Sequence, residues 1–290
     1  MRQINTFILG AQKCGTTTLS DVLRDHPQIY VPKIKELHFF DLHSSRNLQK
    51  EMKHYYKNIM DQHKIIMDAT PSYLYIKECR DKIEKELGND LKFVVILRDP
   101  AKRAYSHYLM TKRVGKETEP FDKAIHLENE RFKDVRSRKE FSYISRGYYY
   151  DQLSYYFETF PRHQFHIMIF EDYIKNPQKE VKGLLNFLGV DDDIELDLSK
   201  RSNQKFVYKS PFFRDFLKFI ASIFRKIKFR PQLLIRFRRR LNRMNKQYIS
   251  DSVKTDINFV ELNNKYYKDD VIKMSELLDR DLTKIWNFGD

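Results

Sequence analysis

The sequence contains little cysteine and no long apolar run. Of its 290 residues two are cysteines, Cys14 and Cys79, and neither has other metal-ligating residues at a useful spacing. A disulfide framework is therefore excluded, no metal is expected, and the composition suits a reducing compartment. No stretch reaches the ~20 apolar residues of a membrane-spanning helix, and the first residues lack the pattern of a secretory signal. We therefore expect a cytoplasmic protein.

Linkers and repeats are also lacking. No Ser/Gly/Pro-rich linker, internal repeat or low-complexity tract interrupts the chain. With 41% hydrophobic and 14% aromatic residues, the chain is able to bury a large core. These features predict a single domain over residues 1–290.

The most informative segment is residues 7–19, FILGAQKCGTTTL. It predicts a buried strand that turns through a glycine loop into a helix, which presents backbone N–H groups and the positive end of the helix dipole to an anion. Gly10 and Gly15 keep the spacing of the nucleotide-binding P-loop, G-x-x-x-x-G-K-S/T, but threonines follow Gly15 and the only lysine lies inside the loop. The candidate anion ligands of the loop are Lys13, Cys14, Gly15, Thr16, Thr17 and Thr18.

This loop resembles the 5′-phosphosulfate loop of sulfotransferases that use 3′-phosphoadenosine 5′-phosphosulfate (PAPS). In that family a later strand ends in an arginine, and a serine about two helical turns further on joins it in binding the 3′-phosphate. Residues 93–108, FVVILRDPAKRAYSHY, match this pattern with Arg98 and Ser106. A helix opened by Asp99-Pro100 would bring both side chains near the carboxyl end of the strand. The two motifs in this order are typical of the family.

The resemblance implies roles that suit these residue types. Transfer of a sulfuryl group develops negative charge on the oxygen that bridges to the 5′-phosphate, which Lys13 would stabilise. A bidentate guanidinium suits a 3′-phosphate, so Arg98 would distinguish PAPS from other adenine nucleotides, with Ser106 as a neutral donor. Taken singly, Lys13 also fits a solvated loop lysine, and Arg98 an ion pair with Asp99. We interpret Cys14 as a small loop residue and not as a nucleophile, although a helix N-terminus lowers thiol pKa values.

A third segment, residues 27–41, has the sequence PQIYVPKIKELHFFD. It resembles the Lys-Glu-x-His-Phe-Phe segment of bacterial and glycosaminoglycan-type sulfotransferases, in which the glutamate is the general base. Because a carboxylate can take the proton of a weakly nucleophilic hydroxyl, we assign this role to Glu36. His38 is the alternative base, since small-molecule sulfotransferases use a histidine, but it also fits a packing role. Lys35 is a candidate substrate contact, with a plain surface charge as the alternative.

Residues 64–74, KIIMDATPSYL, predict a strand followed by a helix that starts around Pro71. The family has a similar Thr-Pro-x-Tyr turn beside the acceptor, which makes Tyr73 a candidate substrate contact. The same strand also resembles a Walker B strand with Asp68 on Mg²⁺, as in a P-loop nucleotide kinase. Without a lysine after Gly15 this interpretation loses its main support, and it is kept as the alternative enzyme class.

The strand and helix pattern predicts the fold class. Apolar runs at 4–9, 64–67, 91–97 and 164–169 predict strands, each followed by a helical pattern. We therefore expect an α/β fold, P-loop-like and three-layered, with a central parallel sheet of four to five strands flanked by helices. Ligands of such folds bind at the carboxyl edge of the sheet, where all three motifs fall.

Further candidates lie toward the C-terminus. Residues 147–160, GYYYDQLSYYFETF, predict an aromatic-rich helix like the Gly-x-Tyr helix of the family. Its Tyr148 is a candidate contact to cofactor or acceptor, with core packing as the alternative. The segment that starts at Arg201 resembles the loop that closes over the nucleotide in related bacterial enzymes, which implies nucleotide contacts for Asn203 and Lys205. Residues of these types in loops also commonly face water.

The positive charge is concentrated in one segment. Eleven of the net +14 charges fall between Asp215 and Asp251, where eleven Lys or Arg and no acidic residue occur. The interleaved apolar residues predict a basic helical segment at about 211–250, with two amphipathic helices separated near Pro231. It fits a surface for an anionic glycan, peripheral contact of residues 216–250 with an anionic membrane, or a solvated cover over the site. Nucleic acid is not favoured, because no recognised binding module is present.

Together the motifs predict a PAPS-dependent sulfotransferase that acts on an acceptor hydroxyl, of a carbohydrate or glycolipid, by direct in-line transfer without a metal. The alternative from another class is a non-catalytic nucleotide- or nucleic-acid-binding protein. Glu36 discriminates between the two, because a binding protein needs no carboxylate in that segment. We expect the enzyme in the cytoplasm, peripheral to the inner face of the membrane.

Overall fold

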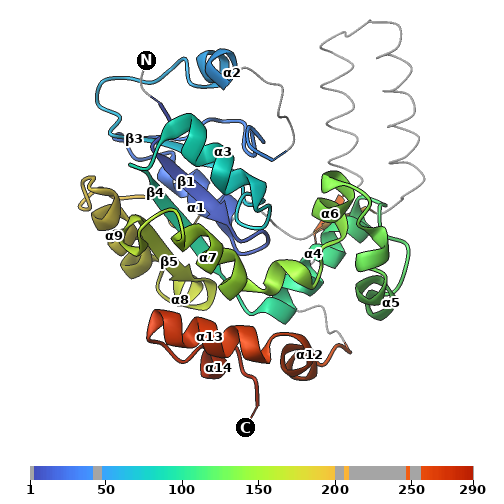
Figure 1. Ribbon diagram of the computed structural model, residues 1–290. Coiled ribbons are helices and arrows are strands. Elements are labelled where there is room, and N and C mark those ends of the chain that lie inside the picture. Colours follow the sequence, from blue (N-terminus) through green and yellow to red (C-terminus); the bar gives the residue numbers. More distant parts are fainter. Residues whose placement is uncertain (1–2, 42–47, 200–205, 209–245, 249–255, 290) are drawn as a thin grey trace, which may run out of the picture. The chain divides into compact units, whose positions relative to one another are not determined.

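The computed structural model describes residues 3–41, 48–199, 206–208, 246–248 and 256–289 (Figure 1). Its chain divides into two compact units, Met1–Ser202 with Asn258–Asp290 and Asn203–Ile257, which are described separately. The single domain expected over the whole chain therefore stays a prediction.

The described part of the second unit contains a pair of antiparallel strands, β6 (Phe206–Tyr208) and β7 (Lys246–Tyr248). Strand β7 lies near the end of the predicted basic helical segment, so the prediction of a helix is wrong for residues 246–248. The rest of that predicted segment lies outside the described residues.

The first unit contains a five-stranded, all-parallel sheet in the order β2-β3-β1-β4-β5. Its strands are β1 (Thr6–Gly10), β2 (Ile29–Tyr30), β3 (Ile65–Ala69), β4 (Lys92–Leu97) and β5 (Phe165–Ile169). All residues of β1 and β3 are buried, as expected of apolar strands covered on both faces. After β1 the chain adds β2 and then β3 on one side of that strand, and it later adds β4 and β5 on the other side, so the strand order reverses beside β1. Ligands of such sheets bind at this reversal point.

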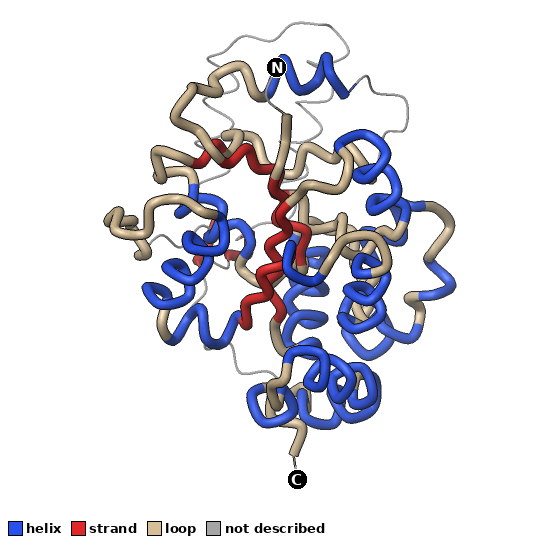
Figure 2. Tube along the Cα trace, turned by 60° about the vertical axis from the view of Figure 1, so that its left-hand side comes forward, coloured by secondary structure: helices blue, strands red, loops and turns tan. Residues whose placement is uncertain are grey.

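Helices cover both faces of the sheet, as Figure 2 shows. On one face Phe93 lies opposite Phe7 and Phe165 in the register, and the ring of Tyr156 packs 6.0 Å from that of Phe93. On the other face the ring of His166 packs 5.3 Å from a ring of α9. The helices of the first unit are α1 (Thr16–Leu23), α2 (Leu48–Tyr55), α3 (Glu78–Leu87), α4 (Pro100–Arg113), α5 (Phe121–His126), α6 (Val135–Phe141), α7 (Tyr149–Phe157), α8 (Phe170–Lys175), α9 (Pro177–Leu188), α12 (Phe259–Tyr266), α13 (Lys268–Leu278) and α14 (Leu282–Ile285).

The C-terminal helices hold the N-terminal ends of helices that border the sheet edge. Asn263 of α12 accepts from the amide of Ala101 at 3.1 Å and donates to the Asp99 carboxylate at 3.2 Å. Asp270 of α13 accepts from the amides of Tyr149 and Tyr150 at 2.8 and 3.1 Å. Side chains that satisfy the first N–H groups of a helix fix where it begins. The starts of α4 and α7 are thereby anchored beside the carboxyl edge of the sheet.

The predicted α/β class with a parallel sheet flanked by helices is confirmed. The four strands expected from apolar runs are present, and the two-residue β2 extends the sheet at its edge. The helix start predicted around Pro71 is wrong. Residues 71–75 form turns that are tied to the end of β1 by the bond from the Leu74 amide to the Leu9 carbonyl at 3.1 Å, and α3 begins at Glu78.

Candidate active site

The loop between β1 and α1 forms a cradle of backbone N–H groups. Gly15 precedes α1 with φ 87°, and no described side chain caps the first turn of that helix. A Cβ on Gly10 would lie 2.9 Å from the Cβ of Leu74, which explains the first glycine of the motif. The amide of Ala11 donates to the Ile96 carbonyl of β4 at 2.8 Å and holds the loop against the neighbouring strand. An anion bound at this end of α1 would meet the N–H groups of residues 16–18.

Lys13 lies in this loop with its backbone in the left-handed region, at φ 75°. Few non-glycine residues adopt this conformation, and it costs about 1–3 kcal/mol that the surrounding fold must offset. Burial, and then the charges of Arg113 and Arg98, lower the pKa of the Lys13 amine to about 8. A cation held among other cations gains from an anion, which would raise this pKa again.

Cys14 is fully buried and its Sγ lies 4.0 Å from the hydroxyl oxygen of Tyr149. Burial raises the pKa of its thiol to about 12 and outweighs the neighbouring arginines. The thiol is therefore neutral at physiological pH and packs as a small loop residue. Its backbone N–H donates to the Ala11 carbonyl at 3.2 Å, so Cys14 shapes the loop and in this structure offers no free donor to an anion.

Arg98 follows β4 directly, beside the loop. Its Nη1 donates to the backbone oxygen of Lys13 at 3.3 Å. The ion pair between Arg98 and Asp99 that the sequence leaves open is not formed. Asp99 instead pairs with the Lys102 amine at 3.0 Å and caps α4 by accepting a hydrogen bond from the Lys102 amide. Ser106 lies half-buried on α4, about two turns from its start.

Lys35 lies against the cradle, where the sequence pattern had suggested an acceptor contact or a surface charge. Its Nζ donates to the Thr17 hydroxyl of α1 at 3.0 Å. Burial lowers the pKa of Lys35 to about 8, although the nearby charge of Glu36 raises it. Lys35 is thus a second cation at the helix end that Lys13 flanks. The first and third sequence motifs meet at this hydrogen bond.

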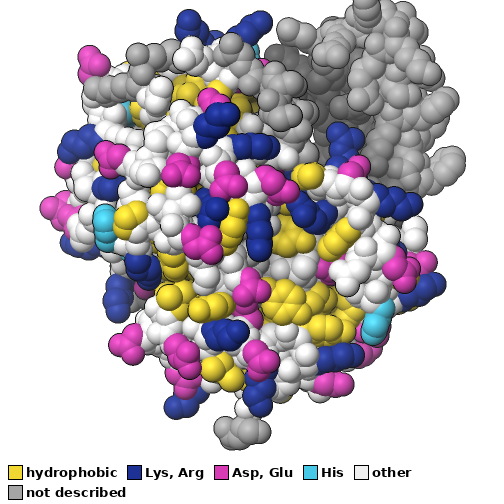
Figure 3. Space-filling view, viewed as in Figure 1, with side chains coloured by type: hydrophobic (Ala, Val, Ile, Leu, Met, Phe, Trp, Pro, Cys, Tyr) yellow, Lys and Arg dark blue, Asp and Glu magenta, His cyan; other side chains and the backbone are white. Residues whose placement is uncertain are grey.

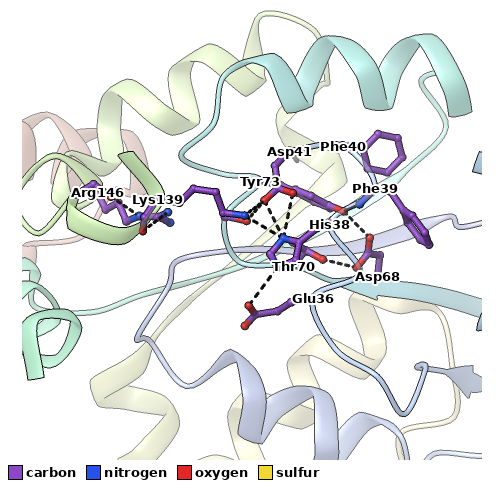
Figure 4. Close-up of polar contacts among 12 residues, drawn as sticks. Glu36, His38, Phe39, Phe40, Asp41, Asp68, Thr70, Tyr73, Lys139 and Arg146 are labelled. Atoms are coloured by element: carbon purple, nitrogen blue, oxygen red, sulfur yellow. Dashed lines mark hydrogen bonds and ion pairs between the residues drawn. The ribbon is translucent and has the colours of Figure 1, made fainter. Parts of the chain in front are cut away.

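Glu36 and His38 follow Lys35 and both have left-handed backbone, with φ 55° and 57°. The amide of Glu36 donates to the Ala69 carbonyl at the end of β3 at 3.3 Å, which fixes the segment to the sheet edge. The side chain of Glu36 is 45% exposed, and its Oε2 lies 3.8 Å from Nε2 of His38 (Figure 4). A carboxylate that is exposed but attached to a fixed backbone is available to a ligand.

A buried network holds the other side of the His38 ring. Nδ1 of His38 lies 3.0 Å from Oδ2 of Asp41, and Nζ of Lys139 lies 2.5 Å from the same oxygen. Ser72 donates a further hydrogen bond to Asp41. Burial alone would raise the pKa of Asp41, but the bonds and charges of His38 and Lys139 hold it well below its usual range. Sequence reasoning missed Asp41 and Lys139; the His-Phe-Phe-Asp spacing points to the first, but Lys139 comes from α6, far along the chain.

Asp68 and Tyr73 form a buried hydrogen-bonded pair that supports the segment of residues 36–41. Asp68 is 1% exposed and accepts from the hydroxyls of Thr70 at 2.7 Å and Tyr73 at 3.0 Å. Burial raises the pKa of Asp68 to about 6. Because both carboxylate oxygens already bind protein donors, the arrangement argues against the Walker B role. Within the described residues no group of three His, Cys, Asp or Glu side chains is placed to hold a metal ion.

Tyr73 is fully buried, and its hydroxyl also accepts from the amide of Phe39 at 2.9 Å (Figure 4). Its side chain therefore supports the segment that carries Glu36 and His38, and in this structure it offers no surface to a substrate. Tyr148 is half-buried before α7, with its ring 5.4 Å from that of Tyr267. The next residue, Tyr149, reaches the site: its hydroxyl donates to the Arg98 carbonyl at 2.8 Å. The predicted nucleotide contacts Asn203 and Lys205 lie outside the described residues.

The fold and this site define a class, an α/β protein with a phosphate-type loop at the reversal point of a parallel sheet and a carboxylate beside it. The chain belongs to the sulfotransferase family, because the family model described as "Sulfotransferase domain" matches residues 3–215. The family membership predicted from the motifs is confirmed. No described helix is long and apolar enough to cross a membrane.

Comparison with known proteins gives relatives at low identity. The human protein "Heparan sulfate glucosamine 3-O-sulfotransferase 3B1" is 29% identical over 187 residues, which is 63% of this chain and 45% of that protein. "Membrane-associated sulfotransferase kil1" of Dictyostelium discoideum is 22% identical over 301 residues, 77% of this chain and 63% of that protein. The chain thus spans about half the length of the curated relatives it matches. A solved structure, "Sulfotransferase from Alicyclobacillus acidocaldarius", shares the fold with a TM-score of 0.72 at 23% identity, covering 99% of this chain and 100% of that one.

Proposed function

We propose that this protein transfers the sulfuryl group of PAPS to an acceptor hydroxyl. The observation that carries the proposal is the hydrogen bond between Lys35 and Thr17, at 3.0 Å. It joins the segment of Glu36 to the anion cradle, so that a proton acceptor stands beside the place of a transferable anionic group. A nucleotide-binding protein without chemistry has no need for this juxtaposition.

The chain offers separate groups for the two ends of the cosubstrate. The N–H groups of residues 16–18, with Lys13, suit the 5′-phosphosulfate, and Lys35 adds a second cation there. Arg98 and Ser106 suit the 3′-phosphate, because a guanidinium binds phosphate in a bidentate manner. When bound, PAPS supplies an activated sulfuryl group. Lys13 and Lys35 would stabilise the charge that develops on the leaving phosphate, which makes a metal unnecessary in this proposal.

Glu36 suits the role of general base better than His38. Its carboxylate is exposed, whereas His38 is half-buried and its Nδ1 is engaged by Asp41 at 3.0 Å. The remaining nitrogen of His38 faces the Glu36 carboxylate, so His38 orients the base. The acceptor proton would pass to Glu36 as the new S–O bond forms.

The acceptor in this proposal is a hydroxyl of a carbohydrate or glycolipid. One relative is named for sulfation of heparan sulfate glucosamine and another for membrane association. Figure 3 shows basic and acidic side chains interspersed on the displayed face. In the sequence, eleven of the net +14 charges fall between Asp215 and Asp251. We propose that residues 216–250 contact a polyanionic acceptor or an anionic membrane of the cytoplasmic face.

Radiolabelled PAPS tests the activity. Incubation with lipid, polysaccharide and small-molecule fractions of the host should place label in one fraction, and Glu36→Gln should abolish transfer while nucleotide affinity is retained. Retained transfer would move the base to His38. Calorimetry without Mg²⁺ should show that adenosine 3′,5′-bisphosphate binds at least about tenfold more tightly than AMP, the value of one charge-assisted contact. Equal affinities would refute the role of Arg98.

A further inference from the structure

A third strand end borders the cradle and carries an aromatic residue. Phe170 is the first residue of α8, directly after β5, and it is half-buried. Strand β4 lies between β1 and β5 in the sheet, so the loop after β1, Arg98 after β4 and Phe170 after β5 are neighbours at one edge. The sequence gives the first two positions a ligand role; the segment that starts at Phe170, FEDYI, also resembles the family but implies no role for the ring.

The Phe170 ring contacts both other elements. Its centroid lies 4.8 Å from the guanidinium carbon of Arg98, within the range of a cation–π interaction. A Cβ on Gly15 would stand 3.0 Å from Cε2 of the ring. Glycine is therefore required at position 15 for two reasons: it allows the Phe170 ring to approach the backbone closely, and it adopts the φ of 87° without strain. The ring joins the anion cradle to the arginine.

Among the residues that the structure describes, no carboxylate pairs directly with Arg98. The acidic residues that follow Arg98 and Phe170 in the chain bind other partners: Asp99 pairs with Lys102, and Glu171 accepts from the indole of Trp286 at 3.0 Å. The buried Nε of Arg98 has no hydrogen-bond partner among the described residues. A carboxylate partner would compete with a phosphate for the guanidinium, whereas an aromatic face and a backbone oxygen orient it without a direct ion pair.

We propose that Phe170 is a positioning residue, whose ring holds the Arg98 guanidinium against the cradle and thereby sets the preference for nucleotides with a 3′-phosphate. The inference rests on the proposed function, because it gives Arg98 that phosphate. A ring that stacked directly on the adenine would instead strengthen every adenine nucleotide to the same degree.

Nucleotide selectivity is the test. In Phe170→Leu, which keeps an apolar side chain, we expect calorimetry to show about five- to tenfold weaker binding of adenosine 3′,5′-bisphosphate, the value of a partly desolvated cation–π contact. AMP affinity should change less than about twofold. Phe170→Tyr keeps the ring and should restore the wild-type ratio of the two affinities.

Phe187→Leu is the matched control. Phe187 is also half-buried and lies 5.6 Å from the Nζ of Lys92, but that lysine begins β4 at the end opposite Arg98. The control should leave both affinities unchanged. In an Arg98→Leu background, Phe170→Leu should no longer alter the ratio, because the two residues act through one contact.

Three results would overturn the inference. An equal loss for both nucleotides would place the ring on the shared adenosine moiety or in the fold. If the wild type prefers the bisphosphate and Phe170→Leu leaves the ratio of bisphosphate to AMP affinity unchanged, Phe170 has no positioning role. The proposed function would then stand without it. A wild type that binds both nucleotides equally would refute the role of Arg98 and this inference with it.

Discussion

Replacing Asp41 with asparagine tests whether a buried ion pair holds the histidine beside the proposed base. The Asp41 carboxylate is 0% exposed and lies 2.5 Å from Nζ of Lys139, which is itself 13% exposed. Asparagine keeps the size of the side chain but leaves the Lys139 charge without its partner. Removing one member of a buried pair costs about 3–5 kcal/mol. Because the asparagine oxygen still accepts hydrogen bonds, we expect the lower limit, about 3 kcal/mol.

The assay is urea unfolding at pH 7, followed by circular dichroism. The double variant Asp41→Asn, Lys139→Met removes both charges and should be more stable than Asp41→Asn alone, since no buried charge is left unpaired. A cost for Asp41→Asn of less than about 1 kcal/mol, the range of exposed pairs, would refute the reasoning.

The same variant has a defined pH dependence. His38 and Lys139 hold the pKa of Asp41 in the folded protein well below its usual range. The stabilisation is therefore complete above the unfolded pKa of about 3.9 and decreases as the pH falls further toward the folded pKa. The difference in unfolding free energy between wild type and Asp41→Asn should therefore shrink as the pH falls below about 4. A difference that grows as the pH falls below about 4 would contradict this assignment.

Three further results are expected. Tyr73→Phe removes the bonds to Asp68 and to the Phe39 amide and should cost about 1–3 kcal/mol in urea unfolding, with nucleotide affinity in calorimetry unchanged. Burial raises the pKa of Cys14 to about 12, so iodoacetamide at pH 8 should label it only after unfolding, as mass spectrometry would show; rapid labelling of native protein would contradict its burial. Because the pKa values of Lys13 and Lys35 are both lowered to about 8, bisphosphate affinity should fall as the pH rises from 7 to 9. Lys13→Met should make this dependence shallower, and Lys35 accounts for the part that remains.

Much of the fold was predictable because its signals are local. The apolar runs that became β1, β3, β4 and β5 are short and bounded by polar segments, and parallel strands buried on both faces require such runs. The two-residue β2 has no comparable pattern and exists through its pairing with β3. Pro71 fits a helix start locally, but the bond from Leu74 to β1 selects a turn there. Tertiary contacts of this kind leave no periodic signal.

The candidate site was predictable where a motif carries its chemistry. Lys13, Arg98 and Glu36 lie at successive points of the same sheet edge, as the order of the motifs indicates. Residues that act on those groups from other elements were missed. Lys139 lies on α6, outside the motifs, and Phe170 opens a segment that resembles the family, but neither residue type indicates by itself which group it contacts.

Backbone conformation adds information that residue types alone do not contain. Lys13, Glu36 and His38 are three of the five non-glycine residues with positive φ among those described, and all three belong to the candidate site. Each such residue is less stable than a glycine would be there, by about 1–2 kcal/mol. The surrounding bonds to β3 and β4 offset this cost, and so the directions of these side chains are set by the backbone before any ligand arrives. Strain concentrated on three groups of different charge, at one sheet edge, is what a site pre-organised for an anion and a proton transfer requires.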